Sequence, residues 1–462
     1  MGKNSQKRPA VQQRRSSQHQ RSDGAPSQSR TTTRTLSEAD ISQLITVGAY
    51  FAFGRDEHKS HFATTTEILV DLETAVGPES APRPSRVMAE QLQRGVGELC
   101  EAGWQPADIA HVVKRNGTAR SARLAVALLA HHARSTDAVQ RAPHAWLAQL
   151  DDLGVYDAER GVIVGGQDQP VQGWSRTEKL DPDEMFAIAL QVLGVLITAS
   201  PQSVLMPVPS TWGASNRGVM PTPQVLTGDV DAKALKLIRA LLAKAEATNF
   251  EAEAETFTAK AQEMMTRYSI DAAVLASAAL GSGTSRTAGI ESRRVHVESP
   301  YADEKASLLS VIASVNSARC IWAPGLGIAT VMGFPVDLQL TDMLFTSLLV
   351  QATRASTDAT AADPRLRTPS FRRAFLVAFA HRIGERLEAT REHAAADAEQ
   401  QYGSALVPLL ADRSAAVDEA FAASFPNVVS APIRRVNAAG WHAGRAAADR
   451  AHIGAGEAIT SG

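Results

Sequence analysis

The stretch "LLAKAEATNFEAEAETFTAKAQEMMTRYSID", Leu241–Asp271, is the most regular part of this 462-residue chain. Apolar residues recur every three or four positions along two arms, the first of which begins just before this stretch. They are Leu235, Ile238, Leu242 and Ala245 on the first arm, and Ala254, Phe257, Ala261, Met264 and Tyr268 on the second. This spacing predicts two helices, each with one apolar stripe. Thr248 and Glu251 fit a capping box that opens the second helix. We therefore predict a helical hairpin over residues 231–275 that serves as a packing or docking module.

This hairpin resembles the bacterial family catalogued as domain of unknown function 2786. The family's mark is Lys-Ile-x-x-Leu-Leu-x-x-Ala-Glu followed by Ala-x-x-Lys-Ala-Gln-Glu-Leu-Met. The matching residues are Leu241-Leu242, Ala245-Glu246 and Lys260-Ala261-Gln262-Glu263, with Met264-Met265 replacing Leu-Met and with Lys236 and Ile238 offset by one position. The segment after the hairpin also resembles the region that commonly follows this domain. The resemblance implies no activity and no catalytic residue; Lys260, Gln262 and Glu263 form either a partner-contact face or a solvated one.

The rest of the chain divides by composition and periodicity. Helical periodicity dominates residues 36–199, which predicts an α-helical domain, and residues 200–230 are rich in Pro, Gly and Ser, as in a linker. After the hairpin, residues 290–455 alternate strand-like and helix-like segments in the order β-α-β-β-α and then contain a long helix. We therefore expect an α+β fold, with a helical N-terminal domain and a small α+β C-terminal domain.

Charge is segregated along the chain. Residues 1–35 hold eight basic residues and one acidic residue, a net charge of +7. Because the whole chain carries −2, residues 36–462 carry −9. The first 35 residues lack large apolar side chains, so we predict a disordered basic arm. Such an arm can neutralise nucleic-acid phosphates, or it can be a solubilising tail or fold back on the acidic remainder.

Several classes of protein are not indicated. The arm lacks the apolar run of a secretory signal, and Gln6 departs from the myristoylation pattern. Cys100 and Cys320 are too few and too far apart for a disulfide framework. The longest apolar run, Met185–Ala199, is shorter than a membrane span. We therefore predict a cytoplasmic protein with no membrane partner; the sequence identifies no cofactor.

A helix-turn-helix pattern occupies "ELCEAGWQPADIAHVVKR", with Gly103 at the turn and Pro106 in the first turn of the second helix. Asp108, His111, Lys114 and Arg115 are then expected to project outward, and Arg120 and Arg123 add charge on the next helix. Lys114, Arg115, Arg120 and Arg123 are our predicted nucleic-acid-binding residues. A plain helical bundle produces the same spacing.

The long helix contains the candidates for catalysis. His381 and Glu385 lie one turn apart and could bind a metal with His393, His296 or His442. No His-Glu-x-x-His motif is present, however, and the interleaved arginines favour ion pairs, so we predict no metal site. Asp337, with Asp342, lies at the start of another helix, either as a catalytic carboxylate or as a partner of the helix dipole.

The function that the sequence favours is that of a non-enzymatic protein that associates with nucleic acid through the basic arm, or binds a protein partner at the hairpin. One alternative is a hydrolase, metal-assisted or not, that uses His381, Glu385 and Asp337. The other is a protein–protein adaptor.

Overall fold

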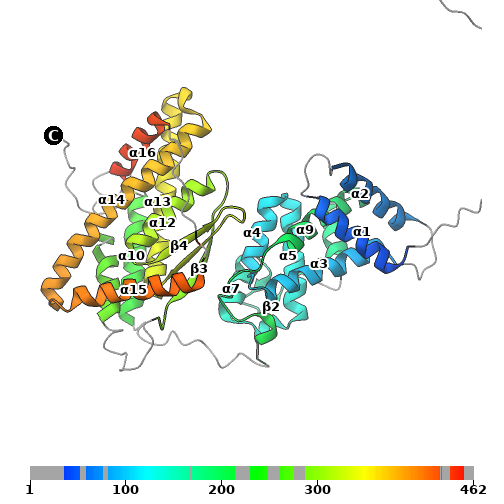
Figure 1. Ribbon diagram of the computed structural model, residues 1–462, viewed down its shortest axis with the longest axis horizontal. Helices are drawn as coiled ribbons and strands as arrows, with labels where there is room; N and C mark the ends of the chain where they lie inside the picture. Colours follow the sequence, from blue (N-terminus) through cyan, green and yellow to red (C-terminus); the bar gives the residue numbers. More distant parts are fainter. Residues whose placement is uncertain are drawn as a thin grey trace, which may run out of the picture.

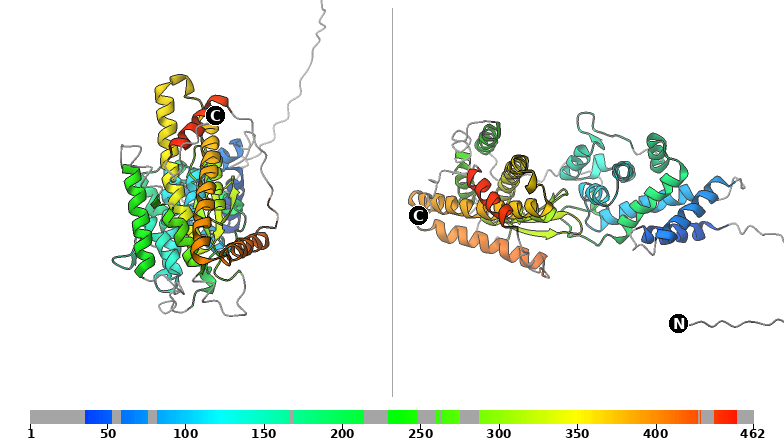
Figure 2. Two further views of the ribbon diagram at one scale, coloured as in Figure 1. Left: turned by 90° about the vertical axis from the view of Figure 1, so that its left-hand side faces the viewer. Right: turned by 90° about the horizontal axis from the view of Figure 1, so that it is seen from above.

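The computed structural model describes residues 36–52, 59–75, 82–165, 169–213, 229–247, 260–261, 263–274, 287–426, 428 and 437–451. The molecule is mostly helical with two small antiparallel sheets, which agrees with the predicted α+β class. Its buried apolar residues form two clusters. We call the described residues of 36–213 the N-terminal body and those of 229–451 the C-terminal body. The two bodies follow one another along the long axis of the molecule (Figures 1 and 2).

The N-terminal body is built from helices around one central apolar helix. Its elements are α1 (Glu38–Phe51), α2 (Lys59–Thr74), α3 (Pro84–Glu101), α4 (Pro106–Asn116), α5 (Ala119–Ser135), α6 (Ala138–Arg141), α7 (His144–Asp152), β1 (Tyr156–Asp157), β2 (Val162–Ile163), α8 (Pro170–Glu178), α9 (Pro182–Thr198) and the 3₁₀ turn Pro209–Thr211. Helix α9 packs against α1, α2, α3 and α5. From Met185 to Leu196 it is mostly apolar, because its neighbours bury most of these residues.

The predicted turn between α3 and α4 is confirmed. Gly103 adopts φ +87°, and a Cβ at this position would come within 2.4 Å of the Gln202 carbonyl oxygen, so only glycine fits. The Gln202 amide donates to the Ala102 carbonyl oxygen at 2.9 Å. Further along, Trp212 is buried and meets Trp146 edge to face. The segment up to residue 213 therefore packs onto the N-terminal body.

The C-terminal body follows the predicted β-α-β-β-α order. Its elements are α10 (Asp229–Ala247), helical residues 260–261 and 263–274, β3 (Glu291–His296), α12 (Ala302–Val315), β4 (Arg319–Ala323), β5 (Ile328–Gly333), α13 (Pro335–Ala362), the 3₁₀ turn Pro364–Leu366, α14 (Pro369–Tyr402), α15 (Leu406–Ser424) and α16 (Ala438–Arg450). The predicted capping box at Thr248 and Glu251 lies outside the described residues. The predicted stripes are buried where they are described, at Leu235, Ile238, Leu242, Ala261 and Tyr268, although Met265 is buried more deeply than Met264.

The three-stranded sheet presents two different faces. Its order is β3-β5-β4, and both pairings are antiparallel. Because side chains alternate along a strand, Val295 and its partner Ala329 share one face, which packs into the C-terminal cluster. Arg294 and His296 lie on the other face. Ile328, opposite His296, belongs to the apolar cluster of the N-terminal body, so this end of the sheet joins the two bodies.

Helices α14 and α16 pack closely through the small residues Gly440 and Gly444 of α16. A Cβ at Gly444 would lie 2.2 Å from the Phe375 carbonyl oxygen. Helix α14 buries a stripe of apolar residues at Phe371, Phe375, Phe379, Ile383 and Leu387. Within the described ranges, no helix is both long enough and apolar enough to cross a membrane.

Candidate functional site

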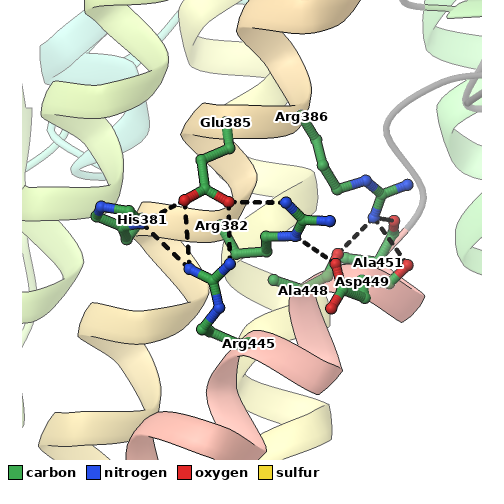
Figure 3. A network of polar contacts seen from close by, with 8 residues as sticks. All are labelled: His381, Arg382, Glu385, Arg386, Arg445, Ala448, Asp449 and Ala451. Carbon is green, nitrogen blue, oxygen red and sulfur yellow. Dashed lines mark hydrogen bonds and ion pairs between the residues drawn. The ribbon is translucent and has the colours of Figure 1, made fainter. Parts of the chain in front are cut away.

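His381 and Glu385 lie together on α14, in a network that connects this helix to α16 (Figure 3). Glu385 is 3.1 Å from His381 Nδ1 and accepts hydrogen bonds from Arg382 at 2.7 Å and from Arg445 at 3.2 Å. Arg382 also pairs with Asp449 on α16. Partial burial opposes ionisation of Glu385, but the two arginines outweigh it, so its pKa lies below the ordinary value. The network therefore joins two helices through ion pairs.

Asp337 belongs to a different group of contacts. It is buried at the start of α13, where it accepts a hydrogen bond from Ser269 Oγ at 2.6 Å and one from Arg413 Nη2 at 2.8 Å. None of its partners contacts His381 or Glu385, so the structure brings only two of the three predicted catalytic residues together. In the described part of the chain, no three His, Cys, Asp or Glu residues are placed to hold a metal ion.

Each of the four predicted nucleic-acid-binding residues has a partner within the protein. Arg120 pairs with Glu184 at 2.9 Å, and Arg123 makes a two-pronged contact with Glu178, all on the surface of the N-terminal body. Lys114 and Arg115 instead reach the C-terminal body. Lys114 pairs with Glu298 at 2.8 Å, while Arg115 donates to Ser299 Oγ at 3.0 Å and to the Pro324 carbonyl oxygen at 3.1 Å. Nucleic-acid binding by these side chains stays a prediction.

The expectation that Asp108 and His111 project outward is wrong. Both are buried where α4 meets the sheet of the C-terminal body. Asp108 accepts a hydrogen bond from the Gln105 amide at 3.0 Å, which caps α4, and it also pairs with Arg294. His296 Nε2 lies 2.8 Å from its other oxygen. Arg294 and His296 share a face of β3, so two residues of one strand hold one carboxylate of the other body.

Asp108 is ionised in this setting. Burial opposes its charge, but the hydrogen bond from His296 and the charge of Arg294 outweigh the burial and keep its pKa below the ordinary value. The ring of His111 stacks on that of His296 with centroids 4.8 Å apart. Burial lowers the pKa of His111, and the nearby His296 lowers it further. The interface therefore combines a paired carboxylate with a histidine that resists protonation.

A cavity of about 1050 Å³ opens beside this interface. Its floor is the edge strand β3: Arg294 and His296 line it from one face of the sheet, and Glu291 and Arg293, which alternate with them, also border the cavity. One wall is the end of α15, and the others come from α4, α7 and residues 203–206 of the N-terminal body. Arg319 of β4 pairs with Asp418 and so holds α15 against this face of the sheet. The cavity is thus made by both bodies together.

The cavity carries an excess of negative charge. Its two arginines are matched, Arg294 by Asp108 and Arg293 by Asp342 on α13. The lining carboxylates Asp152, Glu291 and Glu419 form no ion pair with any described residue. An acidic cavity attracts cations and repels phosphates.

Sequence reasoning did not find this site. The alternation in "SRRVHVE" places Arg294 and His296 on one face, but it does not say which partner that face meets. Their partner Asp108 lies 186 and 188 positions away in the chain. The sequence indicates His296 only as a candidate metal ligand with His381, and these two histidines share no partner among the described residues.

A second, smaller groove of about 300 Å³ lies between α10 and α13, beside the predicted partner-binding hairpin. It is lined by Arg239, Leu242 and Met343 among others. On the neighbouring helical segment, Lys260 pairs with Glu263 at 2.8 Å, and Gln262 lies outside the described residues. A protein partner at this position stays a prediction.

Residues 233–272 match the family model described as "Protein of unknown function (DUF2786)", as the resemblance of the hairpin predicts. No curated protein and no solved structure matches the chain.

Proposed function

We propose that this protein binds a small cation, one that carries amine or guanidinium groups, in the cavity between its two bodies. The observation that carries the proposal is the cavity's charge. Both lining arginines are neutralised by carboxylates, whereas Asp152, Glu291 and Glu419 have no ion-pair partner among the described residues.

The position of the cavity supports this proposal. Ligand sites occur preferentially where two domains meet, because walls from both sides can enclose the ligand. Polar contacts join the two bodies beside this cavity, among them Lys114 with Glu298 and Arg294 with Asp108. Small polar interfaces permit relative movement of domains. A ligand that contacts both walls would therefore stabilise the arrangement in which the two bodies touch.

The proposal is tested by calorimetric titration of the full chain with 1,4-diaminobutane and agmatine. Succinate, a dianion of similar length, is the control ligand. We expect both amines to bind, more weakly as salt rises, and succinate not to bind. The variant with Glu291→Gln and Glu419→Gln should bind at least about tenfold more weakly, because each lost carboxylate removes a charge-assisted hydrogen bond. Glu67→Gln, on exposed α2, is the matched control. Equal affinity in both variants would contradict the proposal.

Nucleic-acid association through residues 1–35 is a separate proposal, supported by their net charge of +7. Phosphates would be held by the arm and not by the acidic cavity. Binding of random DNA and RNA should then fall steeply with salt and be lost in the 36–462 truncation. If the truncation binds as well as the full chain, the arm is not the contact. Lys114→Glu combined with Arg115→Glu then tests the predicted helix.

A further inference from the structure

Two histidines from different bodies stack on one another at the interface. His111 lies on α4 and His296 on β3, and their ring centroids are 4.8 Å apart. His111 is 7% exposed, and its Nε2 has no hydrogen-bond partner among the described residues. A Cβ at Gly327, in the turn before β5, would lie 2.9 Å from this nitrogen, so the turn covers it. Residues of the C-terminal body therefore shield the ring of His111 from water.

Charged groups of both bodies lie around this ring, and its nearby carboxylates are already engaged. On α4, Asp108 is paired with Arg294 and lies 2.8 Å from His296 Nε2. Just after β3, Glu298 is paired with Lys114 at 2.8 Å, and Lys305 of α12 donates to its carbonyl oxygen at 2.9 Å. Arg115 adds a positive charge on the same side as His111, since a Cβ at Gly327 would also lie 2.9 Å from its Nη1. A proton added to His111 would thus find no free carboxylate among these groups.

We propose that the contact between the two bodies is a pH-sensitive switch, in which a proton on His111 drives the bodies apart. While the bodies touch, the protonated ring would face His296 and Arg115 in a place that water does not reach. Separation of the bodies exposes the ring, and water then solvates its charge. Histidine is the side chain that ordinarily changes charge between pH 5 and pH 8, so the switch acts in this range. The inference requires no ligand in the cavity and does not rest on the proposed function.

The direction of the effect follows from the two states of His111. While the bodies touch, burial lowers its pKa below 6.5, and the charges of His296 and Arg115 lower it further. Glu298 and the backbone of Gly327 act in the opposite direction and do not outweigh them. Once the bodies separate, the exposed ring regains a pKa of about 6.5. Contact between the bodies is therefore complete above this pH and is lost below it, with an equilibrium constant that falls by up to about tenfold per pH unit.

The experiment follows the radius of gyration of the full chain by small-angle X-ray scattering from pH 8 to pH 5, without ligand. Far-UV circular dichroism of the same samples reports helix content. We expect the radius to increase as the pH falls and to return when the pH is restored, while helix content stays unchanged. If the radius remains constant, or grows only as helix content is lost, the proposal is wrong.

Two variants test His111 itself. His111→Phe keeps a ring against His296, and His111→Gln keeps a polar side chain, but neither can take up a proton. Both should remove the acid-driven increase in radius. His393→Gln, at an exposed position of α14, is the matched control and should expand like the native protein. If both His111 variants still expand as the pH falls, His111 is not the trigger and the proposal fails.

A third variant distinguishes the two histidines. A proton on His296 has the carboxylate of Asp108 beside it while the bodies touch, whereas a proton on His111 has none. His296→Gln can still donate to Asp108, but it removes one charge that faces His111. The expansion should therefore persist in His296→Gln, with its midpoint shifted to lower pH. If His296→Gln abolishes the expansion and the His111 variants retain it, His296 is the trigger and the proposal is overturned.

Discussion

The two bodies each bury one aspartate at the third position of a helix that begins with proline. In α4 the residues are Pro106 and Asp108, and in α13 they are Pro335 and Asp337. Both side chains are 1% exposed, and each is held by an arginine. The difference lies in where that arginine is. Asp337 bonds to Arg413 within its own body, whereas Asp108 bonds to Arg294 of the other body.

This comparison separates two roles of one local motif. When a buried carboxylate has its partners in its own body, the ion pair must break for that body to unfold. The pair therefore contributes to the stability of the body. A buried carboxylate with partners across an interface is released when the bodies separate, and water then solvates both charges. We therefore expect Asp337 to affect unfolding and Asp108 to affect association. The predictions below test this distinction, from the largest expected effect to the smallest.

Asp337→Ala should destabilise the C-terminal body by about 3–5 kcal/mol, because it leaves the buried guanidinium of Arg413 without its carboxylate. Urea denaturation measures the effect. The matched control is Asp342→Ala on the same helix, whose pairing with Arg293 is partly exposed and should contribute no more than about 1 kcal/mol. If the two variants unfold at the same urea concentration, the role assigned to Asp337 is wrong.

Acidification should destabilise the N-terminal body through His132, which is independent of both aspartates. Burial lowers the pKa of His132 from 6.5 to about 4, and its Nε2 has no described partner. Below pH 6.5, His132 therefore binds a proton in the unfolded chain but stays unprotonated in the folded body until the pH approaches 4. The free energy of unfolding falls as the pH decreases through this range. Between pH 7 and pH 5 the loss should be about 2 kcal/mol.

Thermal unfolding at several pH values measures this loss, and His132→Leu should remove most of it. His111 titrates in the same direction because its pKa is also lowered, so a smaller dependence remains in the variant. A variant that keeps the whole pH dependence would show that His132 is not its source.

Asp108→Asn should change the unfolding free energy of either body by no more than about 1 kcal/mol, since separation of the bodies lets Arg294 reach water. Its effect should appear as a larger radius of gyration in small-angle X-ray scattering. Asp337→Asn, as long as it remains folded, should scatter like the native protein. If Asp108→Asn instead unfolds one body without expanding the molecule, the distinction between the two aspartates fails.

Much of the fold follows from the sequence because periodicity reports burial. The apolar stripes of the hairpin at Leu235, Ile238 and Leu242, the β-α-β-β-α order and the turn at Gly103 are all found where their patterns predict. The site does not follow in this way. On α4, Asp108 and His111 look like solvent-facing residues, because a polar interface and a water-exposed surface use the same side chains. Only the structure shows that Asp108 and His111 contact residues of β3 in the other body.

Both thiols are largely buried. Cys320 lies in a strand, and burial raises its pKa to about 12. Cys100 is buried in α3, and its pKa is raised for the same reason. Neither thiol is therefore a reactive nucleophile near neutral pH.

The alternation of side chains along β3 has a consequence for how this architecture can evolve. Arg294 and His296 meet Asp108 only because both point to one face, and an insertion or deletion of a single residue in β3 would present Arg293 and Val295 instead. The two bodies are thus coupled by the register of one strand. Recombination could exchange one body for that of a relative. It would preserve the contact only if the register of β3 and the aspartate at the position of Asp108 were both retained. Lineages that lose one should lose the other.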